Sequence, residues 1–386
     1  MRLLLVTQDF PPNTGGIETY SFELAKRFVT SVEFFAVIAP THEDADAFDR
    51  KLSFPVYRIP VKNSLLPLVA PFCVIYFMFK NKFDTAFHTQ WQTSFASVLS
   101  RKAGYPKHIY VAAHARELLL RPFNGDNGWL SEKLHSIRKK LFKSIDGFFP
   151  VSNYTASLLH NDGVPQSDTY VVGNGTDPEV FKPKNTATLA EELDIGNKKV
   201  ILSICRLVPR KGLDLVVEAM QQIVLSNEDV TYLIGGTGPD EGRLRALVTD
   251  LGLNDHIRFL GRIPDEKMAS YYSMADVFVM PAGNNPPDVE GFGIVFLEAN
   301  ACETVVIGSR TGGIPDAVIH GETGYLIENK NVEQLIDSLL KLLNNEELAN
   351  QMGKKGRERI LREATWDHVS DSLLENMKRI NKQSER

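Results

Sequence analysis

The stretch that decides the fold of this chain runs from Asp288 to Glu298 and reads DVEGFGIVFLE. It follows an apolar, strand-like run at 277–280 and opens a helical pattern. Gly291 and Gly293 allow the backbone to approach a ligand closely. Because a helix begins with unpaired N–H groups and the positive end of its dipole, this opening suits an anion such as a diphosphate.

Two carboxylates belong to the same stretch, Glu290 and Glu298, eight residues apart. We expect Glu298 more than one turn into the helix, where its carboxylate can accept hydrogen bonds from sugar hydroxyls. Glu290 is expected in the loop before the helix. An anion site beside two such acceptors predicts a pocket for a sugar nucleotide, which combines a phosphate with a polyhydroxylated group.

The whole chain alternates strand-like and helical patterns, which predicts an α/β fold with parallel sheets covered on both faces. Its 386 residues exceed what one core usually supports, so two domains are expected. The expected strands lie at 2–7, 32–39, 55–60, 85–88, 108–113, 147–151 and 169–172, and then at 199–204, 230–234, 257–260, 276–280 and 305–308.

A segment rich in Gly, Asn, Asp and Pro at 173–183 separates the two series of strands. We therefore predict two doubly wound, Rossmann-like domains, 1–172 and 173–365, facing across a cleft, with a polar tail helix at 366–386. Clefts between domains are common sites for small ligands. The loop 8–16 lacks a G-x-G-x-x-G fingerprint, which argues against an NAD enzyme.

Basic residues follow the first expected strand of the second domain, in CRLVPRKG. Arg206 and Lys211 can offset the charge that builds on a departing diphosphate, whereas Arg210 is expected to face solvent. His114 stands at the end of the run 108–113, where sites of α/β proteins form. The turn Gly235–Gly238 is a weak signal, and Gly261–Ile263 follows a strand where backbone groups can contact a nucleobase.

Several chemistries find no support in the sequence. There is no DxD-like pair at a strand end and no paired Cys/His set, so no metal and no cofactor are expected. The sequence contains no Ser-His-Asp set and no nucleophile elbow, so a covalent hydrolase is not expected. Three scattered cysteines fit a reducing cytoplasm, and the apolar run 3–6 is too short for a secretory signal.

Charge is distributed unevenly. Residues 1–172 hold 19 Lys and Arg against 15 Asp and Glu, a net charge of +4, and the remainder holds 24 against 33, a net charge of −9. The basic half either faces an anionic acceptor or membrane surface or reflects ordinary scatter. The apolar stretch Leu65–Phe79 is too short to span a bilayer; it is either a core helix or an apolar face that rests on one.

Five motifs occur in a recognisable order: GGIE, CRLVPRKG, GGTGP, EGFGIVFLEA and RTGGIPD. With them the chain resembles, nearly end to end, the retaining glycosyltransferases of family 4, which have the GT-B fold. The resemblance implies a nucleoside-diphosphate sugar donor held mainly by the second domain. Retention is usually assigned there to attack on the face that the leaving group departs from, with the leaving phosphate taking the acceptor's proton.

The resemblance also implies roles for individual residues. The diphosphate would be bound by Arg206, Lys211, the backbone of Phe292, Gly293 and Ile294, and Gly16 of the first domain. The nucleoside would be bound by Gly238, by Ile263 at the base and by Glu298 at the ribose hydroxyls. The catalytic set would be Arg206, Lys211, His114 at the sugar and Glu290, which would stabilise the sugar's developing positive charge.

Within the family, the stretch 282–302 looks most like phosphatidylinositol mannosyltransferases and related mannosyltransferases. That favours GDP-mannose and a lipid, lipid-linked or glycan acceptor, with UDP-hexose or UDP-N-acetylhexosamine as open alternatives. It also favours a cytoplasmic enzyme that associates peripherally with the inner membrane face, and no nucleic-acid partner. Residues 302–305 read CETV where the family commonly has a Gly-x-Pro turn, which leaves the conformation of this turn open.

Two other functions remain open from the residues alone. A sugar-nucleotide epimerase would share the two-domain plan but needs an additional acid/base set that the sequence does not reveal. A non-catalytic nucleotide-sugar-binding protein would share the pocket, although the presence of Glu290, Glu298, Arg206 and Lys211 argues against it.

Overall fold

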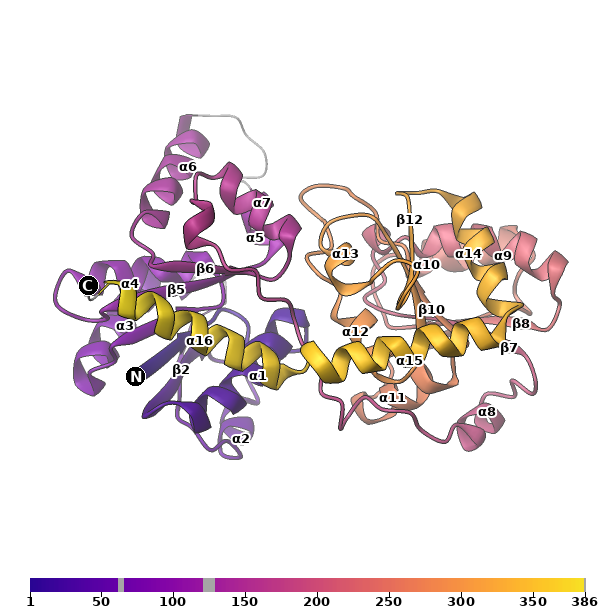
Figure 1. Ribbon diagram of the computed structural model, residues 1–386, viewed down its shortest axis with the longest axis horizontal. Helices are drawn as coiled ribbons and strands as arrows, with labels where there is room; N and C mark the ends of the chain where they lie inside the picture. The colour runs from indigo at the N-terminus through magenta and orange to yellow at the C-terminus, as the bar shows by residue number, and fades with distance from the viewer. Residues whose placement is uncertain (62–65, 121–128, 385–386) are drawn as a thin grey trace. The chain divides into compact units, whose positions relative to one another are not determined.

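The chain forms two compact units, drawn in Figure 1 from a computed structural model that describes residues 1–61, 66–120 and 129–384. Unit 1 comprises Met1–Asn174 and Trp366–Arg386, and unit 2 comprises Gly175–Thr365. The chain thus passes between the units twice. The first passage lies two residues beyond the expected boundary at 172, and the second lies where the tail helix begins.

Unit 1 is built on a six-stranded parallel sheet with the order β3-β2-β1-β4-β5-β6. Its strands are β1 (Arg2–Val6), β2 (Phe34–Pro40), β3 (Val56–Ile59), β4 (Thr85–His88), β5 (His108–Ala113) and β6 (Gly147–Pro150). They are short and mostly apolar, and all but the edge strand β3 are almost wholly buried, as strands covered on both faces must be. Because β2 and β3 extend the sheet from β1 on one side and β4 to β6 on the other, the strand order reverses between β1 and β4.

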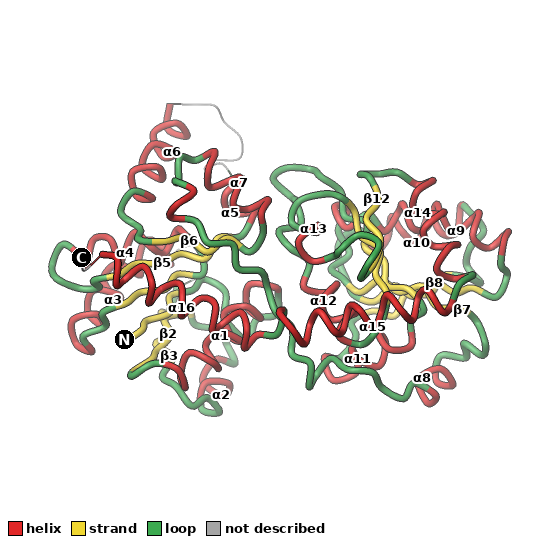
Figure 2. Tube along the Cα trace, viewed as in Figure 1, coloured by secondary structure: helices red, strands yellow, loops and turns green. Residues whose placement is uncertain are grey.

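Helices cover both faces of this sheet, as Figure 2 shows in red against the yellow strands. They are α1 (Gly16–Ser31), α2 (Ala45–Asp49), α3 (Leu66–Asn81), α4 (Ser94–Arg101), α5 (Ala115–Leu119), α6 (Trp129–Phe142), α7 (Asn153–Asn161) and α16 (Trp366–Ser384). The C-terminal helix α16 lies along α1 (Figure 1). It is tied to the unit by an ion pair between Arg27 and Asp367 at 2.5 Å and by a hydrogen bond from Tyr110 Oη to the Met377 carbonyl at 3.1 Å.

Unit 2 repeats the plan with the order β12-β11-β10-β7-β8-β9. Its strands are β7 (Lys199–Ile204), β8 (Val230–Gly235), β9 (Ile257–Gly261), β10 (Val277–Met280), β11 (Val305–Ser309) and β12 (Gly324–Ile327). All pairings are parallel, and the order reverses between β7 and β10. Two doubly wound sheets are therefore present, which confirms the predicted fold class.

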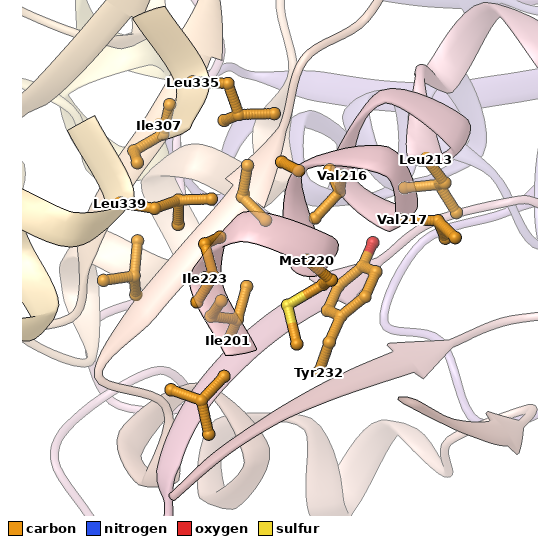
Figure 3. Close-up of a cluster of buried hydrophobic side chains, with 14 of the residues drawn as sticks. Ile201, Leu213, Val216, Val217, Met220, Ile223, Tyr232, Ile307, Leu335 and Leu339 are labelled. Atoms are coloured by element: carbon orange, nitrogen blue, oxygen red, sulfur yellow. The ribbon is translucent and has the colours of Figure 1, made fainter. Parts of the chain in front are cut away.

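The helices of unit 2 are α8 (Ala187–Glu192), α9 (Leu213–Ser226), α10 (Glu241–Asp250), α11 (Asp265–Met274), α12 (Ile294–Ala301), α13 (Ile314–Ala317), α14 (Val332–Leu343) and α15 (Glu346–Glu363). Figure 3 shows how α9 and α14 form part of the core. Val216, Met220 and Ile223 recur at helical spacing on α9 and meet Ile201 of β7, while Leu335 and Leu339 do the same from α14. The hydrophobic repeat of these helices thus sets the face that they bury.

The structure departs from the expected strands at two places. The run 169–172 forms only an isolated bridge from Thr169 to Phe148, with backbone bonds from Tyr170 and Val172 to β6, because the chain there leaves the sheet edge for the passage to unit 2. Conversely, β12 was not predicted, since Gly324 starts a segment of only four residues that pairs along the edge of β11.

The unusual turn at 302–305 has a defined conformation. Glu303 takes φ +63°, in the left-handed region that glycine enters without steric cost. Its side chain gains only a 3.9 Å ion pair with Arg357 in return. Glutamate therefore occupies a position that favours glycine.

We predict that Glu303→Gly raises the free energy of unfolding by about 1 kcal/mol, because it removes the strain of a left-handed residue with a Cβ. In a protein of 386 residues that corresponds to a rise of about 1 °C in Tm, measured by differential scanning calorimetry. Glu303→Ala keeps the Cβ and loses the ion pair, so it serves as the control and should not gain stability. A Glu303→Gly protein no more stable than Glu303→Ala would contradict the assignment of strain.

Candidate active site

The candidate site of unit 2 lies at the carboxyl ends of β7 and β10, where the strand order of the sheet reverses. These two strands are neighbours, with Ile201 paired to Val277 and Leu202 to Phe278. The loops that leave them must diverge to opposite faces of the sheet, and ligands of doubly wound folds bind in the space between such loops. Lys211 follows β7 and Glu290 follows β10.

The loop after β7 is held against the loop after β10 by backbone contacts. Its short 3₁₀ turn, η4 (Pro209–Lys211), ends at Gly212 with φ +69°. A Cβ at Gly212 would lie 2.2 Å from the Pro281 carbonyl oxygen, so only glycine permits this approach. The Gly283 N–H also donates to the Arg210 carbonyl at 2.8 Å. Together these contacts aim the side chains of Arg210 and Lys211.

The loop after β11 fixes the backbone of Glu290. The Gly313 N–H donates to the Glu290 carbonyl at 2.9 Å, and a Cβ at Gly312 would lie 2.2 Å from the same oxygen. The hydroxyls of Ser309 and Thr311 both donate to the Ala282 carbonyl. In the sequence, the turn RTGGIPD was only a family motif. In the structure it holds in place the loop that contains Glu290.

These loops assemble a compact cluster of charge. Glu290 Oε2 accepts a hydrogen bond from Lys211 Nζ at 2.6 Å and another from the Arg210 guanidinium. The side chains of Lys211 and Glu290 are only 9% and 14% exposed. Burial alone would raise the pKa of Glu290, but the charges and hydrogen bonds of Lys211 and Arg210 outweigh it and hold the pKa at about 2. One carboxylate faces two cations, so the cluster carries a net charge of +1.

The expectation for Arg210 was wrong, because its guanidinium bonds Glu290 in this cluster and its side chain is only 28% exposed. Its partner is an acidic loop 80 residues away in the chain, and no local pattern announces such a pairing. Arg206, in contrast, is exposed and makes no ion pair or hydrogen bond with any described residue. No described contact joins Arg206 to Lys211.

The predicted helix opening is present. Gly293 is the N-cap of α12, preceded by the buried Phe292 and followed by Ile294 as the first helical residue. Glu298 is the fifth residue of α12, and its Oε2 accepts a hydrogen bond from Tyr272 Oη at 2.8 Å. Burial raises the pKa of Glu298 to about 7, although the bond from Tyr272 works against that rise. The two carboxylates thus have opposite electrostatic environments.

The loops after β7, β8 and β9 are joined by backbone hydrogen bonds along the same carboxyl edge of the sheet. The Leu207 N–H donates to the Thr237 carbonyl at 3.0 Å, and the Gly236 N–H donates to the Gly261 carbonyl at 2.7 Å. Ile263 is buried and reaches the end of β8, where a Cβ on Gly235 would meet its side chain. Gly238, Ile263 and the backbone at Arg206 therefore belong to one group of connected loops.

The two candidate residues of unit 1 lie at the carboxyl edge of its own sheet. Gly16 begins α1 in the loop after β1, and His114 follows β5. The His114 N–H donates to Glu117 Oε1 at 3.2 Å. Burial lowers the pKa of the imidazole to about 4 against a hydrogen bond to the Thr89 backbone, so the ring is neutral near pH 7. Its Nε2 has no hydrogen-bond partner among the described residues.

Sequence reasoning missed Tyr272 as the partner of Glu298 and Tyr20 as a neighbour of His114. Both are buried tyrosines on helices, and a buried tyrosine at helical spacing reads as an ordinary core residue. Over the described part of the chain, no cluster of three His, Cys, Asp or Glu side chains has the arrangement of a metal site.

Comparison with solved structures defines the class of this fold as GT-B. The structure of the Anabaena protein HepE in complex with UDP superposes with a TM-score of 0.82 at 18% identity, covering 98% of this chain and all of that chain. Sucrose-phosphate synthase from Thermosynechococcus elongatus gives the same TM-score at 20% identity, covering 99% of this chain and all of that one. At these identities the likeness concerns the fold.

The sequence comparisons define the family. The family model "Glycosyltransferase Family 4" matches residues 14–180, and "Glycosyl transferases group 1" matches residues 180–359. The chain is 31% identical to a GDP-mannose-dependent alpha-(1-6)-phosphatidylinositol monomannoside mannosyltransferase of Mycobacterium tuberculosis, over 97% of both chains. It is also 31% identical to a GDP-mannose-dependent monoacylated alpha-(1-6)-phosphatidylinositol monomannoside mannosyltransferase of Corynebacterium glutamicum, over 96% of both chains. The chain belongs to glycosyltransferase family 4 and is a glycosyltransferase.

The two carboxylates should affect stability with opposite pH dependence. The folded-state pKa of Glu298, about 7, lies above its ordinary value of 4.5, so its contribution is present below about pH 4.5 and is lost as the pH rises through 7. Glu298→Gln should therefore be more stable than the unchanged protein at pH 8, by about 1–3 kcal/mol, and should show little gain at pH 4.5. Urea denaturation at the two pH values measures the difference.

Glu290→Gln is the matched comparison, since its depressed pKa of about 2 gives stability that is present above pH 4.5 and lost as the pH falls through 2. This variant leaves Lys211 and Arg210 without their buried counter-charge, so it should lose stability at pH 8. If both substitutions shifted stability in the same direction at pH 8, the assigned environments would be wrong.

Proposed function

We propose that the enzyme transfers a mannosyl group from GDP-mannose, with retention of configuration, to a phosphatidylinositol mannoside or a related lipid-linked or glycan acceptor. The donor and acceptor are supported by the names of the relatives that match nearly end to end. The observation that carries the site is the buried cluster of Glu290, Lys211 and Arg210, with its net positive charge at the point where the strand order reverses. UDP-hexose and UDP-N-acetylhexosamine are the alternative donors.

The excess positive charge supports a diphosphate site at this cluster. We assign the diphosphate to Lys211 and Arg206, to the backbone of Phe292, Gly293 and Ile294, and to Gly16 of unit 1, and we add Arg210. A helix N-terminus and fixed cations both favour a phosphate anion. They also lower the barrier, because negative charge grows on the diphosphate as its bond to the sugar breaks.

The remaining residues are assigned to the sugar and nucleoside. Glu298 binds the ribose hydroxyls, with Gly238 and Ile263 at the nucleoside. Glu290 and His114 contact the transferred sugar. His114 is neutral at pH 7, and its Nε2, which has no partner among the described residues, can form a hydrogen bond with a sugar hydroxyl. Glu290 remains ionised and can stabilise positive charge on the sugar ring.

The reaction needs no protein nucleophile in this scheme. The bond between the sugar's anomeric carbon and the phosphate oxygen breaks, the acceptor hydroxyl forms a new bond on the same face, and its proton passes to the departing phosphate. GDP and the glycosylated acceptor are the products. Cationic side chains take the part that a divalent metal plays in other transferases, so we propose that the enzyme is metal-independent. An epimerase or a binding protein is not favoured, since the chain belongs to a glycosyltransferase family.

The proposal predicts mannosyl transfer from GDP-mannose to phosphatidylinositol monomannoside by the purified protein, with an α-linked product and unchanged rate in EDTA. NMR of the product reports its anomeric configuration, and GDP release reports the rate. UDP-glucose and UDP-N-acetylglucosamine are run in parallel. An inverted product would refute the retaining assignment, and turnover with UDP-sugars alone would refute the donor assignment.

In the same assay, Lys211→Ala should lower turnover by at least ~100-fold, the scale of losing one preorganised contact to transition-state charge. Lys354→Ala, an exposed lysine on α15, is the control and should leave turnover unchanged. Near-normal turnover of Lys211→Ala would remove this lysine from the mechanism.

We further propose that the enzyme is cytoplasmic and works at the inner face of the membrane as a peripheral protein, which suits a lipid acceptor. Helix α3 supports this. It buries Val74 and Met78 in the core but exposes Phe72, Tyr76 and Phe79 by 77%, 57% and 41%. These three recur at i, i+4 and i+7 and so share one helix face. Of the apolar stretch expected here, Leu65 lies outside the described residues.

The neighbouring helix extends this surface. α4 packs against α3 and exposes Phe95 and Leu99, one turn apart. We call Phe72, Tyr76, Phe79, Phe95 and Leu99 the aromatic face. Exposed lysines flank it at 80, 82, 102 and 107, and Lys80 Nζ lies 5.4 Å from the Tyr76 ring centroid. An apolar face rimmed by lysines suits an anionic lipid surface. Among the described residues, no helix is long and apolar enough to cross a membrane.

We predict that the protein co-sediments with phosphatidylcholine vesicles containing phosphatidylinositol, more weakly without phosphatidylinositol and more weakly in high salt. Phe72→Ser/Tyr76→Ser should weaken the binding at least ~10-fold, because each aromatic ring that enters the bilayer contributes about 1.5–3 kcal/mol. Leu225→Ser is the control, since Leu225 is 87% exposed on unit 2 and lies outside the aromatic face. Equal binding by both variants would rule out this surface.

A further inference from the structure

Tyr20 of helix α1 lies between two aromatic partners within unit 1. Its ring is fully buried, and it meets the His114 imidazole edge-on, with ring centroids 5.2 Å apart and planes at 89°. It also meets the Trp366 indole, with centroids 6.0 Å apart and planes at 71°. Edge-to-face pairs at such separations are attractive and directional. Tyr20 therefore constrains the plane of the His114 ring.

The other contacts of His114 do not by themselves fix the orientation of its ring. The His114 N–H bonds Glu117 Oε1, which fixes the backbone but not the side-chain torsions. The imidazole is hydrogen-bonded to the Thr89 backbone and also accepts from the Glu117 backbone N–H; neither contact involves Nε2, so both hold one edge of the ring and leave it able to tilt. Nε2 has no partner among the described residues. The direction in which Nε2 points thus depends on what packs against the ring, and Tyr20 packs there.

Tyr20 in turn packs against Trp366, which is held in place. Trp366 is almost fully buried and is the first residue of α16, directly after the chain returns from unit 2. The ion pair of the adjacent Asp367 with Arg27 anchors this end of α16 to α1. The hydroxyl of Tyr20 bonds to nothing among the described residues and is shielded from solvent. The ring, and not the hydroxyl, therefore makes the contacts that matter.

We propose that Tyr20 is a positioning residue for His114: its ring, seated against Trp366, holds the imidazole in the orientation that presents Nε2 to the transferred sugar. This inference rests on the proposed role of His114. The inference also gives the start of α16 a role in the reaction. Trp366, the first residue after the chain's second passage between the units, supports Tyr20.

The test uses the full-length enzyme with GDP-mannose and phosphatidylinositol monomannoside, and determines kcat and the donor KM for four single variants. Tyr20→Leu keeps apolar bulk but removes the ring, and we expect kcat to fall about tenfold or more with donor KM little changed, since misplacing a reacting contact chiefly slows the chemical step. Tyr20→Phe keeps the ring and should retain the kcat of the unchanged protein. Phe28→Leu removes another fully buried ring of α1, one that packs on Phe35 and Phe87, and should leave kcat unchanged. His114→Ala should lower kcat.

The double variant Tyr20→Leu/His114→Ala distinguishes positioning from general damage. If Tyr20 acts through His114, the double variant should have the kcat of His114→Ala alone, because there is no imidazole left to misplace. Additive losses, or a Tyr20→Leu enzyme no slower than Phe28→Leu beside an impaired His114→Ala, would overturn this inference and leave the role of His114 standing. An unimpaired His114→Ala would overturn that role and this inference with it.

Discussion

A buried carboxylate that is to stay ionised needs positive charge beside it, and the second unit supplies that charge at Glu290. Removing one partner from such a group leaves an uncompensated charge in a poorly solvated place, which is costly. Three loops from three strands are therefore brought together: one supplies Arg210 and Lys211, one supplies Glu290, and the turn at 309–313 holds the Glu290 backbone. Because two cations meet one carboxylate, the same arrangement that stabilises Glu290 leaves positive charge for an anionic ligand. Folding and the proposed binding of a diphosphate use the same groups.

The two units share one strand order but differ in the chemistry at their carboxyl edges. Unit 2 concentrates charge there, with Glu290 kept ionised and Glu298 titrating near neutrality. Unit 1 presents a neutral histidine packed edge-on against the Tyr20 ring. A parallel sheet determines where its loops emerge, and the loops determine what they carry. The division suits the proposed reaction, in which one substrate is a charged nucleotide sugar and the other is a lipid or glycan.

Much of the architecture was predictable because the strands are buried on both faces. Continuous apolar runs such as 108–113 and 199–204 formed strands with the predicted bounds. Two strand predictions failed: 169–172, next to the edge strand β6, forms only a bridge, and β12, an edge strand of four residues that begins at a glycine, was not foreseen. At the site, the Gly-rich opening of α12 and the place of Glu298 within it followed from local pattern. The roles assigned to the individual site residues stay predictions.

By itself, the sequence determined the fold class, the family and the types of side chain available, because these depend on periodicity and on motifs contiguous in the chain. Only the tertiary structure decided which charges meet. Arg210 looked like a solvent-facing residue until the loop after β10 brought Glu290 to it, and Tyr20 looked like core until β5 placed His114 against its ring. Such pairings join residues some 80 to 95 positions apart. They are set by the order of strands in the sheet and by the close approach of loop backbones, neither of which is written in any local stretch of the chain.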